Sequence, residues 1–217
     1  ASTRAIRRRA KKRPAGLHSA CGAWRGARGG QAPLAPPAVA GGAAGPRGAR
    51  AMISKKVCLL GGFAVGKTSL VARFVHGVFS EKYLTTIGVK IDKRSMTVDD
   101  DELDLVIWDI YGEDDYQRVR MSYLRGASGL LLVADGTRRD TLEVAKGLRL
   151  TARDHLGTIP SVLLVNKADL RAAWEIGPED LDVLREQGWR VYETSAKTGD
   201  GVEGAFAALA RLLHEAR

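Results

Sequence analysis

The stretch Gly61-Gly62-Phe63-Ala64-Val65-Gly66-Lys67-Thr68 decides how this sequence folds. It lies between an apolar run at residues 57–60, typical of a strand covered on both faces, and an amphipathic segment at 68–76, typical of a helix. Glycine at 61 and 66 excludes bulky side chains, so successive backbone N–H groups can curl around an anion. The helix N-terminus adds partial positive charge. Strand, loop and helix together predict a phosphate-binding loop.

Two side chains of this loop extend the prediction to a nucleotide. Lys67 supplies a positive charge to terminal phosphates, and the Thr68 hydroxyl can reach Mg²⁺. The pattern G-x-x-x-x-G-K-[ST] in this strand–helix context predicts a nucleoside triphosphate with magnesium, without distinguishing ATP from GTP. We expect the nucleotide to be contacted here by Gly61, Phe63, Ala64, Val65, Gly66, Lys67, Thr68 and Ser69.

A second polar motif, Asn166-Lys167-Ala168-Asp169, directly follows the apolar run at 161–165. A carboxylate at this place can accept hydrogen bonds from N1–H and N2–H of guanine, whereas adenine offers no such pair. By analogy with base-edge readout, a bidentate match provides roughly 1–3 kcal/mol of discrimination. The motif therefore predicts that Asp169 selects guanine.

A third motif, Thr194-Ser195-Ala196-Lys197, follows the last expected strand. The backbone N–H of Ala196 could meet guanine O6, and the apolar stems of Lys167 and Lys197 could sandwich the ring. The predicted base-contacting residues are Asn166, Lys167, Asp169, Ser195, Ala196 and Lys197.

In the rest of the chain, expected strands alternate with expected helices. This order predicts a three-layer α/β protein built on one sheet with right-handed crossovers. Apolar runs at 129–134 and 161–165 are expected as central parallel strands, and residues 89–98, which alternate with charged residues, as an edge strand. Asp99-Asp100-Asp101 indicates a hairpin turn, so the sheet should be six-stranded and mostly parallel with one antiparallel hairpin strand. The remaining expected elements are strands at 103–108 and 189–192 and helices at 141–155 and 202–213.

The 217 residues, 45% of them hydrophobic, suit one globular domain, which we expect at 52–217. Residues 1–51 should form a disordered tail rich in Ala, Gly, Arg and Pro. Residues 1–50 hold 11 of the 34 Lys and Arg residues and no Asp or Glu, so the overall charge of +9 becomes −2 for the remainder. The charge pattern therefore predicts no nucleic-acid partner for the domain.

The tail itself has three readings. Its cluster Arg7-Arg8-Arg9 with Lys11-Lys12-Arg13 could bind nucleic acid or an anionic membrane, and an Arg-rich segment without acids could be a transit peptide. The interpretation that we favour is that translation was assigned a start too far upstream, and that the true first residue is Met52.

Two cysteines, Cys21 and Cys58, exclude a disulfide scaffold and a cysteine-built zinc site and fit a reducing compartment. No apolar run reaches 18 residues, which excludes a membrane-spanning helix. We expect a cytoplasmic protein.

These motifs occur in the order and spacing of the Ras superfamily of small GTPases, and over residues 51–217 the chain resembles its Rab-like branch. The resemblance implies the P-loop NTPase fold. Tyr83-Leu84-Thr85-Thr86-Ile87-Gly88-Val89 resembles the first switch, Trp108-Asp109-Ile110-Tyr111-Gly112-Glu113 the second, and Tyr123-Leu124-Arg125-Gly126-Ala127 a stretch typical of Rab proteins.

The resemblance also implies roles for single residues. Thr68, Thr86 and Asp109 should hold Mg²⁺, the last through water, and Thr86 and Gly112 should give backbone N–H groups to the γ-phosphate. Phe79 should lie against guanine and Tyr83 should close over the phosphates, although taken alone both aromatic residues suit plain core packing. The implied catalytic residues are Glu113, Lys67 and Gly112.

Three departures from the family surround the γ-phosphate. Glu113 replaces the Gln that orients the attacking water, and an ionised Glu only accepts hydrogen bonds and brings negative charge near a polyanion. Phe63 replaces a small Gly where an arginine finger of an activating protein must pass, and Tyr111 replaces a small Ala. We therefore expect slow intrinsic GTP hydrolysis.

The carboxyl end also departs from Rab proteins, which usually finish with prenylated cysteines. No cysteine follows Cys58, so we expect no prenyl anchor at this end of the chain as given. Prokaryotic small GTPases also lack such tails. Effector and regulatory proteins should bind through the switch loops.

The leading hypothesis is a GTP-dependent molecular switch with slow hydrolysis. Glu113 favours one alternative, a non-hydrolysing GTP-binding interaction module. A P-loop kinase or ATPase is a further alternative, but it leaves the motifs at 166–169 and 194–197 without a purpose.

Overall fold

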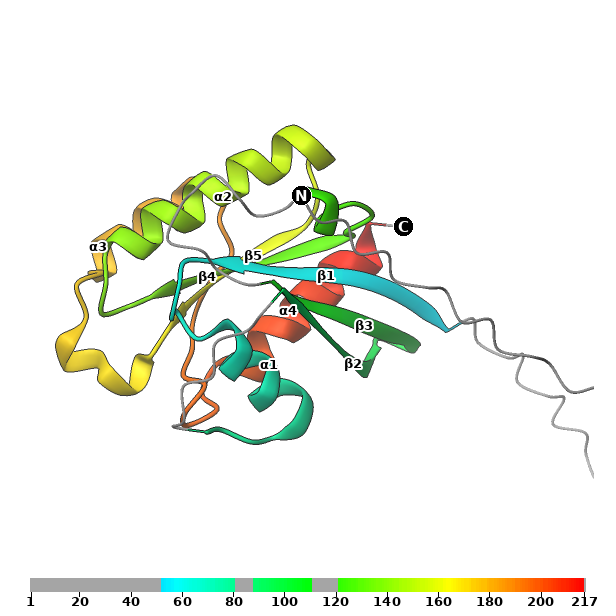
Figure 1. The fold of residues 1–217 in the computed structure, drawn as a ribbon, viewed down its shortest axis with the longest axis horizontal. Helices are drawn as coiled ribbons and strands as arrows, with labels where there is room; N and C mark the ends of the chain where they lie inside the picture. The colour runs from blue at the N-terminus through cyan, green and yellow to red at the C-terminus, as the bar shows by residue number, and fades with distance from the viewer. Residues whose placement is uncertain (1–51, 81–87, 111–120, 217) are drawn as a thin grey trace, which may run out of the picture. The chain divides into compact units, whose positions relative to one another are not determined.

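The computed structural model describes residues 52–80, 88–110 and 121–216. Within these ranges six strands form one sheet in the order β2-β3-β1-β4-β5-β6 (Figure 1). Only β2 and β3 pair antiparallel, so the predicted mostly parallel α/β sheet with one hairpin strand is confirmed. The strands are β1 (Ile53–Gly61), β2 (Val89–Val98), β3 (Asp101–Ile110), β4 (Gly129–Asp135), β5 (Ser161–Asn166) and β6 (Val191–Glu193).

Helices cover both faces of this sheet, which gives the predicted three layers (Figure 1). Helices α1 and α4 pack on one face, and α2 and α3 pack on the other. Their bounds are α1 (Lys67–His76), α2 (Asp140–Leu156), α3 (Pro178–Glu186) and α4 (Val202–Glu215), with short 3₁₀ turns at η1 (Met121–Tyr123) and η2 (Ala168–Ala173).

Strand β1 shows why the sequence demands this layering. Val57 and Leu59 belong to the core under α1 and α4, while Cys58 and Leu60 belong to the core under α2 and α3. Because alternate side chains of a strand point to opposite faces, a continuous apolar run requires a cover on each. Burial also raises the pKa of the Cys58 thiol to about 11, so this cysteine acts as a small core residue.

Strand β2 lies at the edge of the sheet, as its alternating pattern predicts. It turns into β3 through Asp99, whose φ of 54° is left-handed, and pairing resumes at once with Val98 opposite Asp101. The Asp-rich turn is therefore the predicted hairpin, since Asp tolerates this conformation better than most residues.

Two predictions about the end of the chain need correction. The last strand begins at Val191 and not at 189, because the main-chain N–H of Trp189 donates to the carbonyl of Leu184, 2.9 Å away, and closes a turn. The sequence analysis also missed α3. Its start carries a signal, Pro178 in the first turn, and the N–H of Gly177 donates to Asp180 Oδ2 at 2.9 Å.

Several predictions concern residues outside the described ranges: the tail at 1–51 and the parts of the two switches at 83–87 and 111–113. Among the residues that are described, no helix combines the length and apolar character needed to cross a membrane.

The stacked rings of Phe74 and Phe206 join α1 to α4, with centroids 3.8 Å apart, and Phe206 is fully buried. We expect Phe206→Ala to lower the free energy of unfolding by about 3–5 kcal/mol, because it removes this contact and leaves a cavity. Urea unfolding followed by circular dichroism measures the loss. Leu150→Ala is the control, since Leu150 is 61% exposed and should change stability by less than about 0.5 kcal/mol. Equal effects of the two changes would contradict the packing described.

Candidate nucleotide-binding site

The predicted motifs that the structure describes lie at the carboxyl-terminal end of the parallel strands. Strands β1, β3, β4, β5 and β6 run parallel, so their carboxyl ends meet there. The phosphate-loop motif follows β1, Asp109 ends β3, and the motifs beginning at Asn166 and Thr194 follow β5 and β6. Three motifs that are far apart in the sequence, at 61–68, 166–169 and 194–197, thus come together.

The loop between β1 and α1 owes its path to left-handed backbone at Ala64 (φ 56°) and Gly66 (φ 98°). A Cβ at Gly66 would lie 2.3 Å from Asn166 Nδ2, so the loop also requires glycine for space. Gly61 is also required for space, because a Cβ there would meet the carbonyl oxygen of Val133 in β4 at 2.3 Å.

Lys67, in the first turn of α1, folds back over this loop. Its Nζ donates to the carbonyls of Gly61 and Gly62 at 2.9 and 2.8 Å, and the residue is 7% exposed. Burial lowers the pKa of Lys67 to about 8, although the nearby charge of Asp109 acts in the opposite direction. A buried ammonium held mainly by neutral carbonyls is well suited to a polyanionic ligand.

Thr68 and Asp109 form the predicted magnesium position. The Thr68 hydroxyl donates to Asp109 Oδ2 at 2.5 Å. The other oxygen, Oδ1, is buried without a hydrogen-bond partner among the described residues. Burial raises the pKa of the Asp109 carboxyl, an effect that the Thr68 hydroxyl and the charge of Lys67 reduce. An orphaned carboxylate oxygen beside a hydroxyl is a donor set that fits a hard cation such as Mg²⁺.

Asn166, at the end of β5, connects all three motifs. Its Nδ2 donates to the carbonyl of Val65 at 2.9 Å, and its Oδ1 accepts from the Ala196 N–H at 3.2 Å. The Thr194 hydroxyl also donates to Oδ1, at 3.4 Å. Asn166 is buried, so these bonds are sheltered from water and hold the loops in a fixed relation.

Asp169 is exposed and is oriented by the loop that follows β6. The Ser195 hydroxyl donates to Asp169 Oδ1 at 2.6 Å and itself accepts the Thr198 N–H at 3.1 Å. A hydrogen bond from the buried Ser195 thus restrains one oxygen of the exposed carboxylate. This arrangement suits a carboxylate that must present itself to a ligand in one orientation.

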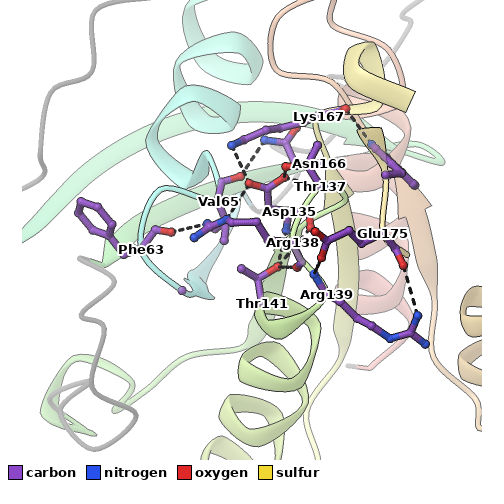
Figure 2. Close-up of polar contacts among 12 residues, drawn as sticks. Phe63, Val65, Asp135, Thr137, Arg138, Arg139, Thr141, Asn166, Lys167 and Glu175 are labelled. Atoms are coloured by element: carbon purple, nitrogen blue, oxygen red, sulfur yellow. Dashed lines mark hydrogen bonds and ion pairs between the residues drawn. The ribbon is translucent and has the colours of Figure 1, made fainter. Parts of the chain in front are cut away.

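Two of the predicted base contacts involve groups that already have partners within the protein. The N–H of Ala196 donates to Asn166, so a base carbonyl would have to share or replace that bond. The Lys167 side chain extends to the buried Asp135, with Nζ 2.6 Å from Oδ2, so its ammonium has a fixed partner within the protein (Figure 2).

For the other predicted contact residues within the described ranges, the structure gives a position but no contact that bears on nucleotide binding. Phe79 is partly buried and packs against the core under α1 and α4, as plain core packing predicts. Ser69 lies in the first turn of α1, and Lys197 is exposed in the loop after β6. Tyr83, Thr86, Gly112 and Glu113, together with Tyr111, lie outside the described residues.

Three supporting residues escaped the sequence analysis. Arg73 of α1 donates through Nε to the carbonyl of Ala196 at 2.8 Å, and Trp174 donates through Nε1 to the carbonyl of Lys167 at 2.9 Å. Only Asp135 carried a usable signal, because it is a charged residue directly after a buried strand, where parallel sheets place ligand loops. The other two give no sequence signal, since their partners are main-chain carbonyls, that of Ala196 being 123 positions from Arg73 in the sequence.

Fold and site together define a P-loop nucleotide-binding protein of the α/β class. A family model described as the Ras family matches residues 56–215. The chain is 34% identical to the Ras-related protein Rab-13 of Bos taurus over 158 residues, which cover 72% of this chain and 78% of that relative. It is 38% identical to the Ras-related protein RABA1c of Arabidopsis thaliana over 161 residues, covering 73% and 74%. The chain therefore belongs to the Ras family of small GTPases, and the predicted likeness to Rab proteins is confirmed.

The contact between Gly66 and Asn166 generates a test. Gly66→Ala forces a Cβ against Asn166, whereas Gly77→Ala has nothing within 4 Å of its Cβ, although Gly77 also has left-handed backbone (φ 68°). We expect the control to lower the free energy of unfolding by about 1 kcal/mol for the backbone alone. Gly66→Ala should lower it by a further 1–3 kcal/mol, roughly the cost of unpaired buried groups. Urea unfolding in EDTA measures both, and equal losses would contradict the role given to Asn166.

Proposed function

We propose that this protein is a guanine-nucleotide-dependent molecular switch, which binds GTP and GDP with Mg²⁺ and hydrolyses GTP slowly. The observation that carries the proposal is the carboxylate of Asp169, held by Ser195 at one end of a site whose other end is the phosphate loop. Membership of the Ras family supports the nucleotide.

At the base end, Asp169 would accept both N–H groups of guanine. Its oxygen Oδ1 already accepts the hydroxyl of Ser195, which fixes the plane of the carboxylate. Adenine would not offer the carboxylate the matching pair of N–H donors, and a polar site deprived of its ligand's partner groups discriminates strongly. The proposed ligand is therefore a guanine nucleotide and not ATP.

At the phosphate end, Lys67 and the N–H groups of the loop would bind the phosphates, and Thr68 and Asp109 would hold Mg²⁺. The Oδ1 of buried Asp109, which has no hydrogen-bond partner among the described residues, supports the metal. Mg²⁺ would neutralise phosphate charge, which the protein must otherwise balance with its own cations. In the same proposal Thr86 joins the metal ligands.

The output would be a change of binding surface. Thr86 and Gly112 would sense the γ-phosphate, and its loss would release the two switches that carry them. Effectors and regulators would then distinguish the two nucleotide states by the shape of the switches.

Hydrolysis would be slow because of Glu113, the residue that stands where the family has Gln. A carboxylate cannot donate a hydrogen bond to the developing charge, and it is repelled by the phosphates. The same residue favours the second candidate function, a GTP-binding interaction module that does not hydrolyse. Multiple-turnover phosphate release with and without cell extract separates the two.

Nucleotide specificity tests the leading proposal. We expect Asp169→Asn to weaken GDP and GTP binding by roughly 5- to 150-fold, because it removes the bidentate acceptor, and to strengthen xanthosine nucleotide binding. Titration calorimetry with GDP, XDP and ADP, with Mg²⁺ and again in EDTA, measures this. Asp182→Asn is the matched control, since Asp182 pairs with Arg185 on α3. If wild-type protein shows no GDP binding in the presence of Mg²⁺, the proposal is wrong.

The role of Glu113 has its own test. Single-turnover hydrolysis of bound GTP should accelerate about tenfold in Glu113→Gln, because the amide both donates and accepts. Glu102→Gln, on the exposed face of β3, should leave the rate unchanged. If wild type hydrolyses as fast as ordinary small GTPases and Glu113→Gln adds nothing, slow hydrolysis is wrong.

A further inference from the structure

The carboxylate of Asp135, at the end of β4, is fully buried between the two nucleotide-binding loops (Figure 2). Oδ1 accepts the N–H and hydroxyl of Thr137 at 3.0 and 2.8 Å. Oδ2 accepts Arg138 Nε at 3.1 Å and lies 2.6 Å from Lys167 Nζ. Burial alone would raise the pKa of Asp135, but the hydrogen bonds from Lys167 and Thr137 outweigh it, so the pKa is lowered and the group stays ionised.

Arg138 extends this buried charge to the phosphate loop. Its Nε is bound to Asp135, and its Nη2 donates to the main-chain carbonyl of Phe63 at 2.7 Å (Figure 2). The guanidinium therefore bridges the end of β4 and a peptide of the loop, 75 positions away in the sequence. A planar fork with several donors is suited to binding two acceptors at once.

The main chain of Arg138 is fixed as well. The buried hydroxyl of Thr141 donates to the Arg138 carbonyl at 2.6 Å, and it accepts the N–H of Asp135 at 2.9 Å. Arg138 thus projects from a turn between β4 and α2 whose main chain is held in place, and its partly exposed side chain is fixed at the guanidinium by Asp135 and the Phe63 carbonyl.

The contact with Phe63 determines how the next N–H points. A trans peptide is planar, so its carbonyl and its N–H point in opposite directions. With the Phe63 carbonyl turned to Arg138, the N–H of Ala64 must point away from it. Ala64 has left-handed backbone (φ 56°), a conformation that a non-glycine residue keeps only under external constraint.

We propose that Arg138 is a positioning residue of the phosphate loop: anchored on Asp135, it orients the Phe63–Ala64 peptide so that its N–H is available to a phosphate. Lys167 binds the same Asp135 oxygen, so one buried carboxylate supports both the phosphate loop and the base-reading loop. This inference rests on the proposed nucleotide function and adds a residue to it.

The next residue in the chain offers a matched control. Arg139 is also an arginine in the turn before α2, but it donates to the carbonyl of Glu175 and pairs with Asp180, and Figure 2 shows it directed away from Phe63. Replacing it changes net charge as much as replacing Arg138 does, without touching the phosphate loop.

The experiment compares Arg138→Gln, Arg138→Lys and Arg139→Gln, each loaded with GDP and Mg²⁺. Release of a fluorescent GDP analogue gives the dissociation rate, and ³¹P NMR of bound GDP reports the surroundings of the phosphates. We expect Arg138→Gln to raise the dissociation rate roughly 5- to 20-fold, since a charge-assisted bond is lost, and to shift a phosphate resonance. Arg138→Lys should fall between, because one ammonium cannot span both acceptors, and Arg139→Gln should stay within about twofold of wild type.

The outcomes separate this inference from the function on which it rests. Wild-type protein without GDP affinity would overturn the proposed function. If wild type binds GDP and folded Arg138→Gln keeps both its rate and its resonances, the positioning role is wrong. Faster release of the GDP analogue with unshifted phosphate resonances also overturns the positioning role, because a general loosening of the fold would then explain the faster release. Should Arg138→Gln fail to fold, Arg138→Lys decides by the same two readouts.

Discussion

The side-chain amide of Asn166 donates to the carbonyl of Val65 and accepts from the N–H of Ala196, and the rest of the site depends on these two bonds. They join loops that follow three different strands, β1, β5 and β6. Only an amide serves here, because a carboxylate could accept but not donate. The group is buried, so each lost bond would leave a polar atom without water to replace it. The phosphate end and the base end are therefore held at a set separation before any ligand arrives.

Charge is distributed around this amide in a way that favours a polyanion. Lys67 is buried against carbonyls, with its pKa lowered to about 8. Asp109 is buried, and one of its oxygens has no partner in the part of the chain that the structure describes. Both groups are poorly solvated as they stand. A phosphate near Lys67 and a cation near Asp109 would relieve both desolvation penalties at once, which gives a physical reason for a magnesium nucleotide to bind tightly.

Family membership explains some features of this protein, and the chemistry of single residues explains others. The Ras family accounts for the sheet and the nucleotide class. The departures from the family at Phe63 and Glu113 are the basis for the rate of GTP hydrolysis and the regulation that we expect of this chain. The contact of Arg138 with the Phe63 carbonyl is also independent of the side chain at 63, since it uses the main chain alone. A bulky residue at this position is thus compatible with a well-supported loop.

The sequence by itself determined the class of fold, the edge of the sheet that carries the site, and the three motifs. These are local signals: a continuous apolar run in β1, a loop with glycine and lysine between strand and helix, and polar residues directly after buried strands. The tertiary structure alone decided that Gly61 serves the approach of Val133, that Ala196 binds Asn166, and that β6 begins at Val191. It alone revealed the support from Arg73, Arg138 and Trp174. Such contacts join a side chain to a main-chain carbonyl, for Arg73 and Arg138 that of a remote loop. Every residue has a carbonyl, so no pattern of side chains in the sequence predicts which one is bound.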